Sequence, residues 1–287
     1  MTHGHLELNQ SPWQGGTAPL AQRPARSTGK SGQTTSRREI DPHTVAARYS
    51  LLFCFLADTK QKRVVVAIDG PAGAGKSTIA KGLASRLGFI YIDTGAMYRA
   101  VALWALRQGV DSGDMHRMEQ LAIAAEIELG PGTISLNGED VTQAIRTPEV
   151  SNGASKIGVI PGVRRAMVAK QREIGERTSV VMEGRDIGTV VFPQADVKIF
   201  LDANPDERVR RRYQEIRTKE DPPSISQGQL AAEMKERDRR DSTRADAPLA
   251  QAPDAVYLDS TALSITEVEE AILKIVRSRV TNGRDFS

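Results

Sequence analysis

Short apolar runs alternate with helical patterns along most of the chain. Five continuous runs rich in β-branched and aromatic residues are typical of buried parallel strands. They lie at 64–68, 89–93, 179–182, 197–202 and 255–259. Apolar residues at helical spacing follow them, for example Ile79, Leu83 and Leu87 after the first run. Because strands and helices alternate without an internal repeat, we predict an α/β fold in which helices cover both faces of a parallel sheet.

One stretch departs from this alternation. Short alternating runs at 127–129, 134–136 and 139–141 are separated by glycine-rich turns, and Asn137-Gly138 is a strong hairpin signal. Helical patterns flank these runs on both sides. The sequence therefore predicts a small antiparallel sheet inserted into the α/β core.

Residues 1 to about 62 differ in composition from the rest of the chain. Pro, Gly, Ser, Thr, Gln and Arg dominate, so we expect most of this stretch to be disordered. An apolar run at 51–56 is too short to span a bilayer. A dispensable bacterial extension is the favoured interpretation; an organelle transit peptide and an over-extended start site remain as alternatives.

A phosphate-binding loop follows the first predicted strand. Gly70-Pro71-Ala72-Gly73-Ala74-Gly75-Lys76-Ser77 fits G-x-x-x-x-G-K-[ST] at every position, between a strand and a helix. In such a loop the backbone N–H groups and the helix N-terminus bind phosphates. The Lys76 ammonium reaches the β- and γ-phosphates, and the Ser77 hydroxyl ligates Mg²⁺. We therefore expect the chain to bind a nucleoside triphosphate.

A second anion site is expected after the second strand. Thr94 is placed to cap the next helix, and Arg99, about one turn into it, is placed to reach back to a phosphate. Taken alone, Thr94 is an ordinary helix cap and Arg99 is a solvated charge. Its position, one helix and one strand after the phosphate loop, favours the functional interpretation.

Charged residues also gather at the end of the third strand and near the C-terminus. Glu183, Arg185 and Asp186 follow an apolar run, where ligands bind in open α/β sheets. The arginine-rich stretches at 208–217 and 237–244 read either as solvated helices or as a mobile lid that closes over phosphates.

Composition limits the other possibilities. Net charge is +3 over 287 residues, so a phosphorylated partner is plausible without demanding nucleic acid. Cys54 is the single cysteine, which excludes an internal disulfide and fits a reducing compartment. No apolar run approaches the length of a membrane span. We expect a cytoplasmic monomer that binds neither nucleic acid nor membrane.

From Val64 to about Val280 the sequence closely resembles the bacterial cytidylate kinases, a family of nucleoside monophosphate kinases. The matching motifs are dispersed and specific, and they span roughly three quarters of the chain. They lie at 68–78, 93–99, 145–150, 161–164, 183–193, 198–203 and 236–241. The resemblance implies transfer of a phosphoryl group from ATP to CMP or dCMP, giving ADP and CDP or dCDP. It also implies Mg²⁺ as the cofactor, bound with ATP.

The resemblance also assigns site residues. It places ATP on Gly70, Pro71, Ala72, Gly73, Ala74, Gly75, Lys76, Ser77 and Thr78. It places CMP on Thr94, Arg99, Ser155, Arg164, Arg185, Asp186, Arg237, Asp241 and Arg244. The implied catalytic residues are Lys76, Arg185, Asp186, Arg211 and Arg212. Glu183 departs from the family pattern, in which Asp also occurs, and is a candidate to bind Mg²⁺ through water.

The resemblance further implies a domain division. A kinase domain over 63–287 would have a core of 63–93, 177–208 and 240–287. A monophosphate-binding insert would occupy about 94–176 and contain the small sheet, and a lid would occupy about 209–239. The 1–62 extension has no counterpart in the usual family pattern.

Two other functions compete with this reading. A kinase of the same build could act on UMP, AMP, dTMP or a small metabolite, since base identity rests on few side chains. A GTPase or an RNA-dependent ATPase is a different class. A GTPase should carry N-K-x-D, which is absent, and the basic N-terminal stretch is the only hint of RNA binding.

Overall fold

Five parallel strands form the central sheet of the computed structural model, which describes residues 63–218 and 224–280. The strand order is β2-β6-β1-β7-β8. These strands are β1 (Val65–Asp69), β2 (Ile90–Asp93), β6 (Val180–Gly184), β7 (Val197–Asp202) and β8 (Val256–Asp259). All four neighbouring pairs are parallel, as the alternation of strands and helices predicts. The predictions for residues 1–62 lie outside the described residues.

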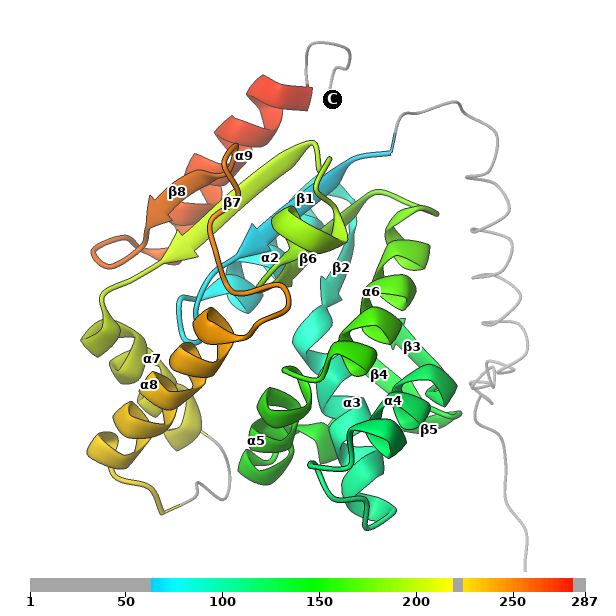
Figure 1. Cartoon of the computed structure of the whole chain (residues 1–287). Coiled ribbons are helices and arrows are strands. Elements are labelled where there is room, and N and C mark those ends of the chain that lie inside the picture. Colours follow the sequence, from blue (N-terminus) through cyan, green and yellow to red (C-terminus); the bar gives the residue numbers. More distant parts are fainter. Residues whose placement is uncertain (1–62, 219–223, 281–287) are drawn as a thin grey trace, which may run out of the picture. The chain divides into compact units, whose positions relative to one another are not determined.

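β1 is the middle strand because its residues are apolar on both faces. Val66 and Ile68 pack with α2 (Lys76–Leu87) and α9 (Ile265–Val280) on one face of the sheet. Ala67 packs on the other face with a short π-helix, η2 (Ile187–Val191). The sheet is therefore covered on both sides, and the loop after β1 opens at its carboxyl edge (Figure 1).

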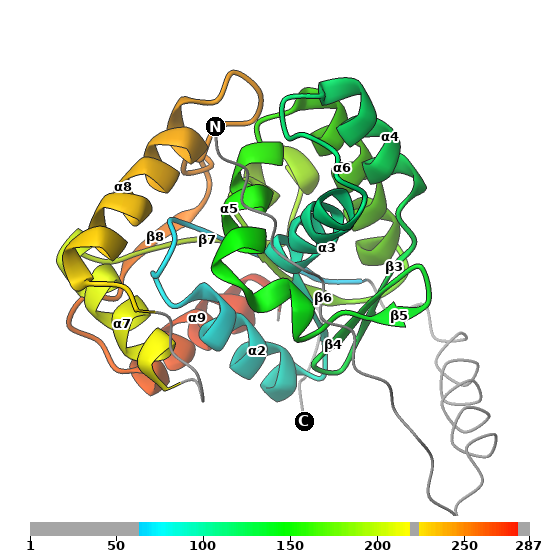
Figure 2. The same cartoon turned by 90° about the horizontal axis from the view of Figure 1, so that it is seen from below.

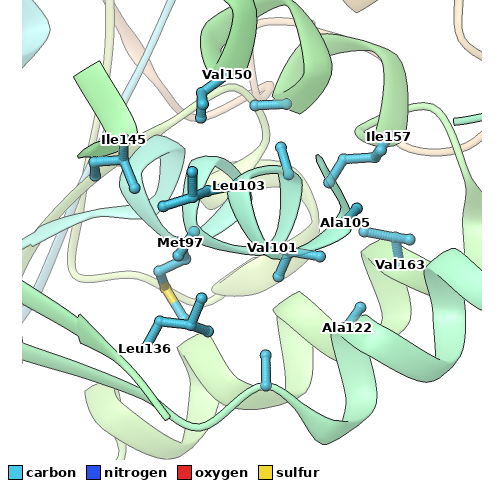
Figure 3. Packing of buried hydrophobic residues seen from close by; sticks show 14 of the residues in the cluster. Met97, Val101, Leu103, Ala105, Ala122, Leu136, Ile145, Val150, Ile157 and Val163 are labelled. Carbon is cyan, nitrogen blue, oxygen red and sulfur yellow. The ribbon is translucent and has the colours of Figure 1, made fainter. Parts of the chain in front are cut away.

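A helical layer with its own apolar core follows β2. It contains four α-helices that precede β6 in the sequence, together with a three-stranded antiparallel sheet ordered β3-β4-β5. Its elements are α3 (Thr94–Arg107), α4 (Met115–Ala124), β3 (Ile127–Gly130), β4 (Thr133–Leu136), β5 (Glu139–Asp140), the 3-10 turn η1 (Ala144–Arg146), α5 (Pro148–Ile157) and α6 (Pro161–Gly175). Met97, Val101 and Leu136 are buried at its centre (Figure 3). The predicted small sheet is confirmed, and Asn137-Gly138 forms its second turn.

Two further helices pack against each other beyond β7. These are α7 (Pro205–Arg217) and α8 (Gln227–Thr243), joined through the buried side chains of Val209, Ile216, Leu230 and Met234. Seen from below, α7 and α8 lie on one side of the molecule and α3 to α6 on the other, with α2 and its preceding loop between them (Figure 2). A pocket lies at the carboxyl end of β6 and is lined by residues of the phosphate loop, α2, α3, α5, α7 and α8.

One local prediction was wrong. Thr94 does not cap α3, because Asp93 accepts the hydrogen bond from the Ala96 N–H at 2.9 Å while the Thr94 hydroxyl donates to the Glu183 carbonyl oxygen. This difference comes from a partner 89 positions away in the sequence. In the stretch 183–189, Glu183 and Gly184 end β6, and η2 begins at Ile187.

Candidate active site

The loop between β1 and α2 has the conformation of a phosphate cradle. Gly73 and Gly75 have φ angles of +77° and +92°, which glycine tolerates and which bend the loop around its own N–H groups. Gly75 immediately precedes α2, so the positive end of the helix faces the same space. The loop from Ala72 to Thr78 lines a cleft of about 1340 Å³.

Lys76 lies buried at the floor of this cleft. Its ammonium group donates a hydrogen bond of 2.6 Å to the Pro71 carbonyl oxygen. Burial, together with the charges of Arg185 and Arg237, lowers the pKa of Lys76 to about 7, against the opposing effect of Glu183. A bound phosphate group would place negative charge beside the Lys76 ammonium and favour its protonated form.

Guanidinium groups gather in the cleft opposite the loop. Arg99 of α3, Arg185 after β6 and Arg237 of α8 line it, together with the Ser155 hydroxyl of α5. Arg185 donates to Asp241 at 2.8 Å, and Arg99 donates to Asp93 at 2.8 Å. Burial and the neighbouring Arg185 together lower the pKa of Arg237 to about 10, against the charge of Asp241. The cationic wall is therefore only partly neutralised by the protein.

A buried ion-pair network supports this wall from behind. Asp186 accepts a hydrogen bond from Arg164, and its other oxygen lies 3.4 Å from Nη2 of Arg244. Burial raises the pKa of Asp186, while Arg164 and Arg244 oppose that effect. These three residues do not line the cleft itself, but they join α6, the turn after β6 and the end of α8.

Several polar atoms near the cleft are buried and have no hydrogen-bond partner among the described residues. They are Ser155 Oγ, Arg164 Nε, Arg237 Nε, Arg240 Nε and Arg244 Nη2. Buried polar atoms are nearly always hydrogen-bonded in native proteins, because an unmet donor costs free energy. Several buried hydrogen-bond donors without acceptors near one cleft are typical of a binding site that an anionic ligand completes.

Glu183 lies next to the start of α2. The Tyr91 hydroxyl donates a hydrogen bond of 2.7 Å to its carboxylate, and the neighbouring Ser77 hydroxyl acts to lower the pKa of that carboxylate. Burial raises the pKa of Glu183, and the nearby Asp93 raises it further. A hydroxyl and a carboxylate beside a phosphate loop fit Mg²⁺, which keeps several waters and needs few protein oxygens. No cluster of three or more His, Cys, Asp or Glu residues suited to a metal occurs within 63–218 and 224–280.

The structure separates the predicted ATP residues into two groups. Ala72 through Thr78 line the cleft, whereas Gly70 and Pro71 do not. Gly70 instead lies against β7, and the Pro71 carbonyl receives the Lys76 ammonium.

The two arginines predicted to be catalytic on the lid both line the cleft but are engaged by the protein. Arg211 donates to Glu207 at 2.8 Å and to the Ser260 hydroxyl and carbonyl at 3.0 and 2.6 Å. Arg212 pairs with Glu215 at 2.7 Å. Arg211 in this arrangement joins α7 to the loop after β8.

Sequence reasoning missed three residues that shape the site. Asp69 holds the turn that carries Asp186, and Tyr91 holds Glu183. Asp238 of α8 accepts a hydrogen bond from Arg208, which also donates to the Ala72 carbonyl at 3.1 Å. Asp69 could have been noticed as a carboxylate at the carboxyl end of a central strand, directly before the phosphate loop.

Comparison with known proteins decides the family. The family model described as cytidylate kinase matches residues 66–278. The chain belongs to the cytidylate kinase family. A curated cytidylate kinase from Solibacter usitatus (strain Ellin6076) is 97% identical over 232 residues, which cover 81% of this chain and 100% of the relative. Those from Pelotomaculum thermopropionicum and Geobacillus kaustophilus are 48% and 49% identical over 76% and 77% of this chain, and over 96% and 99% of their own lengths.

Family membership confirms the main expectations drawn from the sequence. This member of the cytidylate kinase family is a phosphotransferase that transfers the γ-phosphate of ATP to CMP or dCMP. The predicted fold, a parallel sheet with flanking helices, a phosphate loop and an inserted antiparallel sheet, is confirmed as well. In the described part of the chain, no helix is both long enough and apolar enough to cross a membrane.

Proposed function

We propose that the cleft holds the two substrates end to end, with ATP on the loop of Ala72 to Thr78 and CMP or dCMP on the guanidinium wall. The observation that carries this proposal is that two cleft-lining residues, Ser155 and Arg237, each keep a buried polar atom without a hydrogen-bond partner among the described residues. Both residues line the same cleft as the buried Lys76, whose pKa is lowered. Two anionic ligands would satisfy both sides at once.

The acceptor side would divide its work between phosphate and nucleoside. Arg99, Arg185 and Arg237 line the cleft and are suited to the CMP phosphate, because guanidinium groups bind its oxygens in pairs. Ser155 and Asp241 would address the sugar and base, together with the Asp186 network. Thr94 would act indirectly, since its hydroxyl is already committed to the Glu183 carbonyl at 2.7 Å.

Transfer would proceed in line, without a covalent enzyme intermediate. The CMP phosphate is already an anion, so the reaction needs no dedicated general base. Lys76 and the guanidinium groups neutralise the charge that spreads over the transferred group. Arg211 and Arg212 would assist from α7 only after exchanging their present carboxylate partners for phosphate.

We further propose Mg²⁺ as the cofactor, held by the Ser77 hydroxyl and, through water, by Glu183. Held by these residues, Mg²⁺ would supply positive charge that offsets the charge of the phosphates. Tyr91 would keep the Glu183 carboxylate turned toward Ser77.

The domain division and the cellular setting are part of the same proposal. The layer of α3 to α6 would serve as the monophosphate-binding insert over about 94–176, and the α7–α8 pair would contain the lid over about 209–239. We propose a cytoplasmic monomer that acts without nucleic acid. Light scattering of the purified chain, with and without substrates, tests the monomeric state.

An ADP-release assay with ATP, Mg²⁺ and a panel of monophosphates tests the proposal. CMP and dCMP should give turnover well above the ATP-only rate, and UMP, AMP and dTMP should give much less. Equal turnover with AMP or dTMP would show that the base is not read by this site. ADP release that depends on RNA and not on CMP would show a different class of ATPase.

A further inference from the structure

Asp69 is a buried carboxylate that links the strand before the phosphate loop to the turn after β6. It is the last residue of β1, directly before Gly70, and is 4% exposed. One carboxylate oxygen accepts a hydrogen bond of 2.8 Å from the Ile187 N–H, and the other accepts one of 2.7 Å from the Gly188 N–H. Both partners belong to the first turn of η2, whose N–H groups have no helical acceptor.

The turn that Asp69 holds is the one that organises the acceptor side. Arg185 and Asp186 lie immediately before Ile187. Arg185 lines the cleft and pairs with Asp241, while Asp186 joins Arg164 and Arg244. A shift of this turn would therefore move or release several guanidinium groups together.

Packing around the turn leaves little room for it to find another position. A Cβ on Gly188 would lie 3.1 Å from the Lys198 side chain and 3.4 Å from the Asp69 carboxylate. Lys198 itself is fixed, since its ammonium donates to the Pro193 carbonyl at 2.6 Å and to Asp254 at 2.8 Å. The turn thus lies between a fixed lysine stem of β7 and the paired oxygens of Asp69.

We propose that Asp69 is a positioning residue for phosphoryl transfer: it fixes the acceptor-side turn to the strand that feeds the phosphate loop, and so sets the separation of the two substrates. This inference rests on the proposed acceptor site. The carboxylate touches neither substrate. It acts through Arg185 and Asp186, in the way that supporting residues fix the geometry of a site.

The chemistry of Asp69 supports a positioning role over a stabilising one. Burial, together with the charge of Asp186, raises its pKa to about 6 against the two backbone hydrogen bonds and Lys76. The folded protein therefore holds this carboxylate in a place that disfavours its charge. What the charged group supplies is two acceptors with a fixed direction, which an amide side chain of the same size cannot provide.

The variant Asp69→Asn tests the inference because it keeps the volume but leaves only one acceptor. We expect the KM for CMP to rise by about ten-fold or more and kcat to fall, as for loss of a hydrogen bond to a charged group. The Kd for ATP, measured by titration without CMP, should change by less than about three-fold, because the loop from Ala72 to Thr78 keeps its own contacts.

Asp196→Asn is the matched control. Asp196 accepts a hydrogen bond of 2.9 Å from the Val65 N–H, so it makes the same kind of contact at the opposite end of β1. This variant should leave the KM for CMP and the Kd for ATP unchanged. A fall in melting temperature common to both variants would measure the structural part of the effect.

Three outcomes would overturn the inference. The KM for CMP and kcat could stay unchanged in Asp69→Asn while only the melting temperature falls, which would make Asp69 a structural residue. The Kd for ATP could rise as much as the KM for CMP, which would assign Asp69 to the phosphate loop. Asp196→Asn could reproduce the loss. If instead wild type itself fails to phosphorylate CMP, the proposed function has failed, and the two failures are distinguishable.

A measurement on wild type replaces the variant if Asp69→Asn does not fold. The carboxyl carbon of Asp69, observed by NMR, should shift when CMP is added and respond much less to ATP alone. A carboxyl resonance that does not respond to CMP would contradict the coupling between Asp69 and the acceptor side.

Discussion

The Tyr91 hydroxyl donates a 2.7 Å hydrogen bond to Oε1 of Glu183, across the pair of neighbouring parallel strands β2 and β6. The two residues are 92 positions apart in the sequence. Burial raises the pKa of Tyr91, and the Glu183 charge raises it further, so the phenol stays protonated and can only donate to the carboxylate. Tyr91 thus fixes the orientation of a carboxylate that is longer than the aspartate also found in the family.

Tyr91→Phe should weaken the response of the enzyme to Mg²⁺. Removing the hydroxyl keeps the ring but frees the Glu183 carboxylate to rotate away from Ser77, a loss of about 1.5–3 kcal/mol for a hydrogen bond to a charged group. We expect the Mg²⁺ concentration for half-maximal rate to rise several-fold, while the KM for CMP stays nearly constant. Steady-state rates over a Mg²⁺ series, and titration of ATP with and without Mg²⁺, measure this.

Tyr257→Phe is the control for that experiment. Tyr257 lies on the opposite edge strand, is 51% exposed and hydrogen-bonds to Asp202 at 3.5 Å. Its removal should leave the Mg²⁺ dependence as in wild type. An unchanged Mg²⁺ dependence in Tyr91→Phe would refute the positioning role of the phenol.

Arg185→Ala should affect CMP far more than ATP. Arg185 lines the cleft, and its Nε lies 2.8 Å from the Asp241 carboxylate. Its loss therefore removes positive charge from the guanidinium wall and leaves the buried Asp241 less well paired. We expect kcat/KM for CMP to fall by 10²–10³, about the loss seen when one preorganised donor is removed, roughly 2.7–4 kcal/mol. The Kd for ATP should stay within a few-fold of wild type.

Arg165→Ala controls for loss of an arginine in general. Arg165 follows Arg164 in α6, but its side chain is 67% exposed and pairs with Glu119 at the surface. Surface pairs of this kind contribute little, so this variant should retain its activity. Intact CMP turnover in Arg185→Ala would show that its proposed role is wrong.

The strands, the helices and the phosphate loop could be predicted because their signals are local. A β-branched run before Gly70 and apolar residues at helical spacing after it are enough to predict β1 and α2. The helix cap after β2 could not be predicted in the same way. Asp93 and Thr94 are both suitable helix caps. Asp93 caps α3 because the Thr94 hydroxyl is hydrogen-bonded to the Glu183 carbonyl, 89 positions away.

The supporting residues of the site were hidden for the same physical reason. Asp69 meets its partners 118 and 119 positions further along the chain, and only strand pairing brings them together. The guanidinium groups were predictable as a set from the resemblance to the family. Their division into a cleft-lining group and the buried network of Asp186, Arg164 and Arg244 depends on tertiary packing that no local pattern encodes.

Gly70→Ala should abolish folding or destabilise the protein by more than about 4 kcal/mol. An added Cβ would lie only 1.9 Å from the Leu201 carbonyl oxygen of β7, and Gly70 has a φ of +147°, so both space and backbone conformation exclude a side chain. Urea unfolding and the yield of folded protein measure the effect.

Gly228→Ala is the control, since no atom lies within 4 Å of its added Cβ. Gly228 lies in α8, so this control should be neutral or up to about 1 kcal/mol more stable. A soluble Gly70→Ala variant of wild-type stability would contradict the close approach of β1 and β7.

ATP binding above neutral pH should be coupled to proton uptake by Lys76. Burial lowers the pKa of Lys76 to about 7, so at pH 8 the free enzyme holds this residue mostly neutral. The ATP phosphates are already ionised at that pH, and their charge favours the ammonium form, so binding raises the lysine pKa and draws a proton from the buffer. The affinity for ATP should therefore fall as the pH rises from 7 to 9. Calorimetry at pH 8 in buffers with different ionisation enthalpies measures the uptake, which should approach one proton.

Lys76→Arg separates this lysine from other titrating groups. A guanidinium stays charged throughout the pH range, so the variant should bind ATP without taking up a proton, whatever its effect on turnover. Equal binding heats for wild type in all buffers would mean that Lys76 is already charged in the free enzyme. Proton uptake that persists in Lys76→Arg would assign the titration to another buried group of the cleft, with Glu183 the first to be tested, since burial raises its pKa as well.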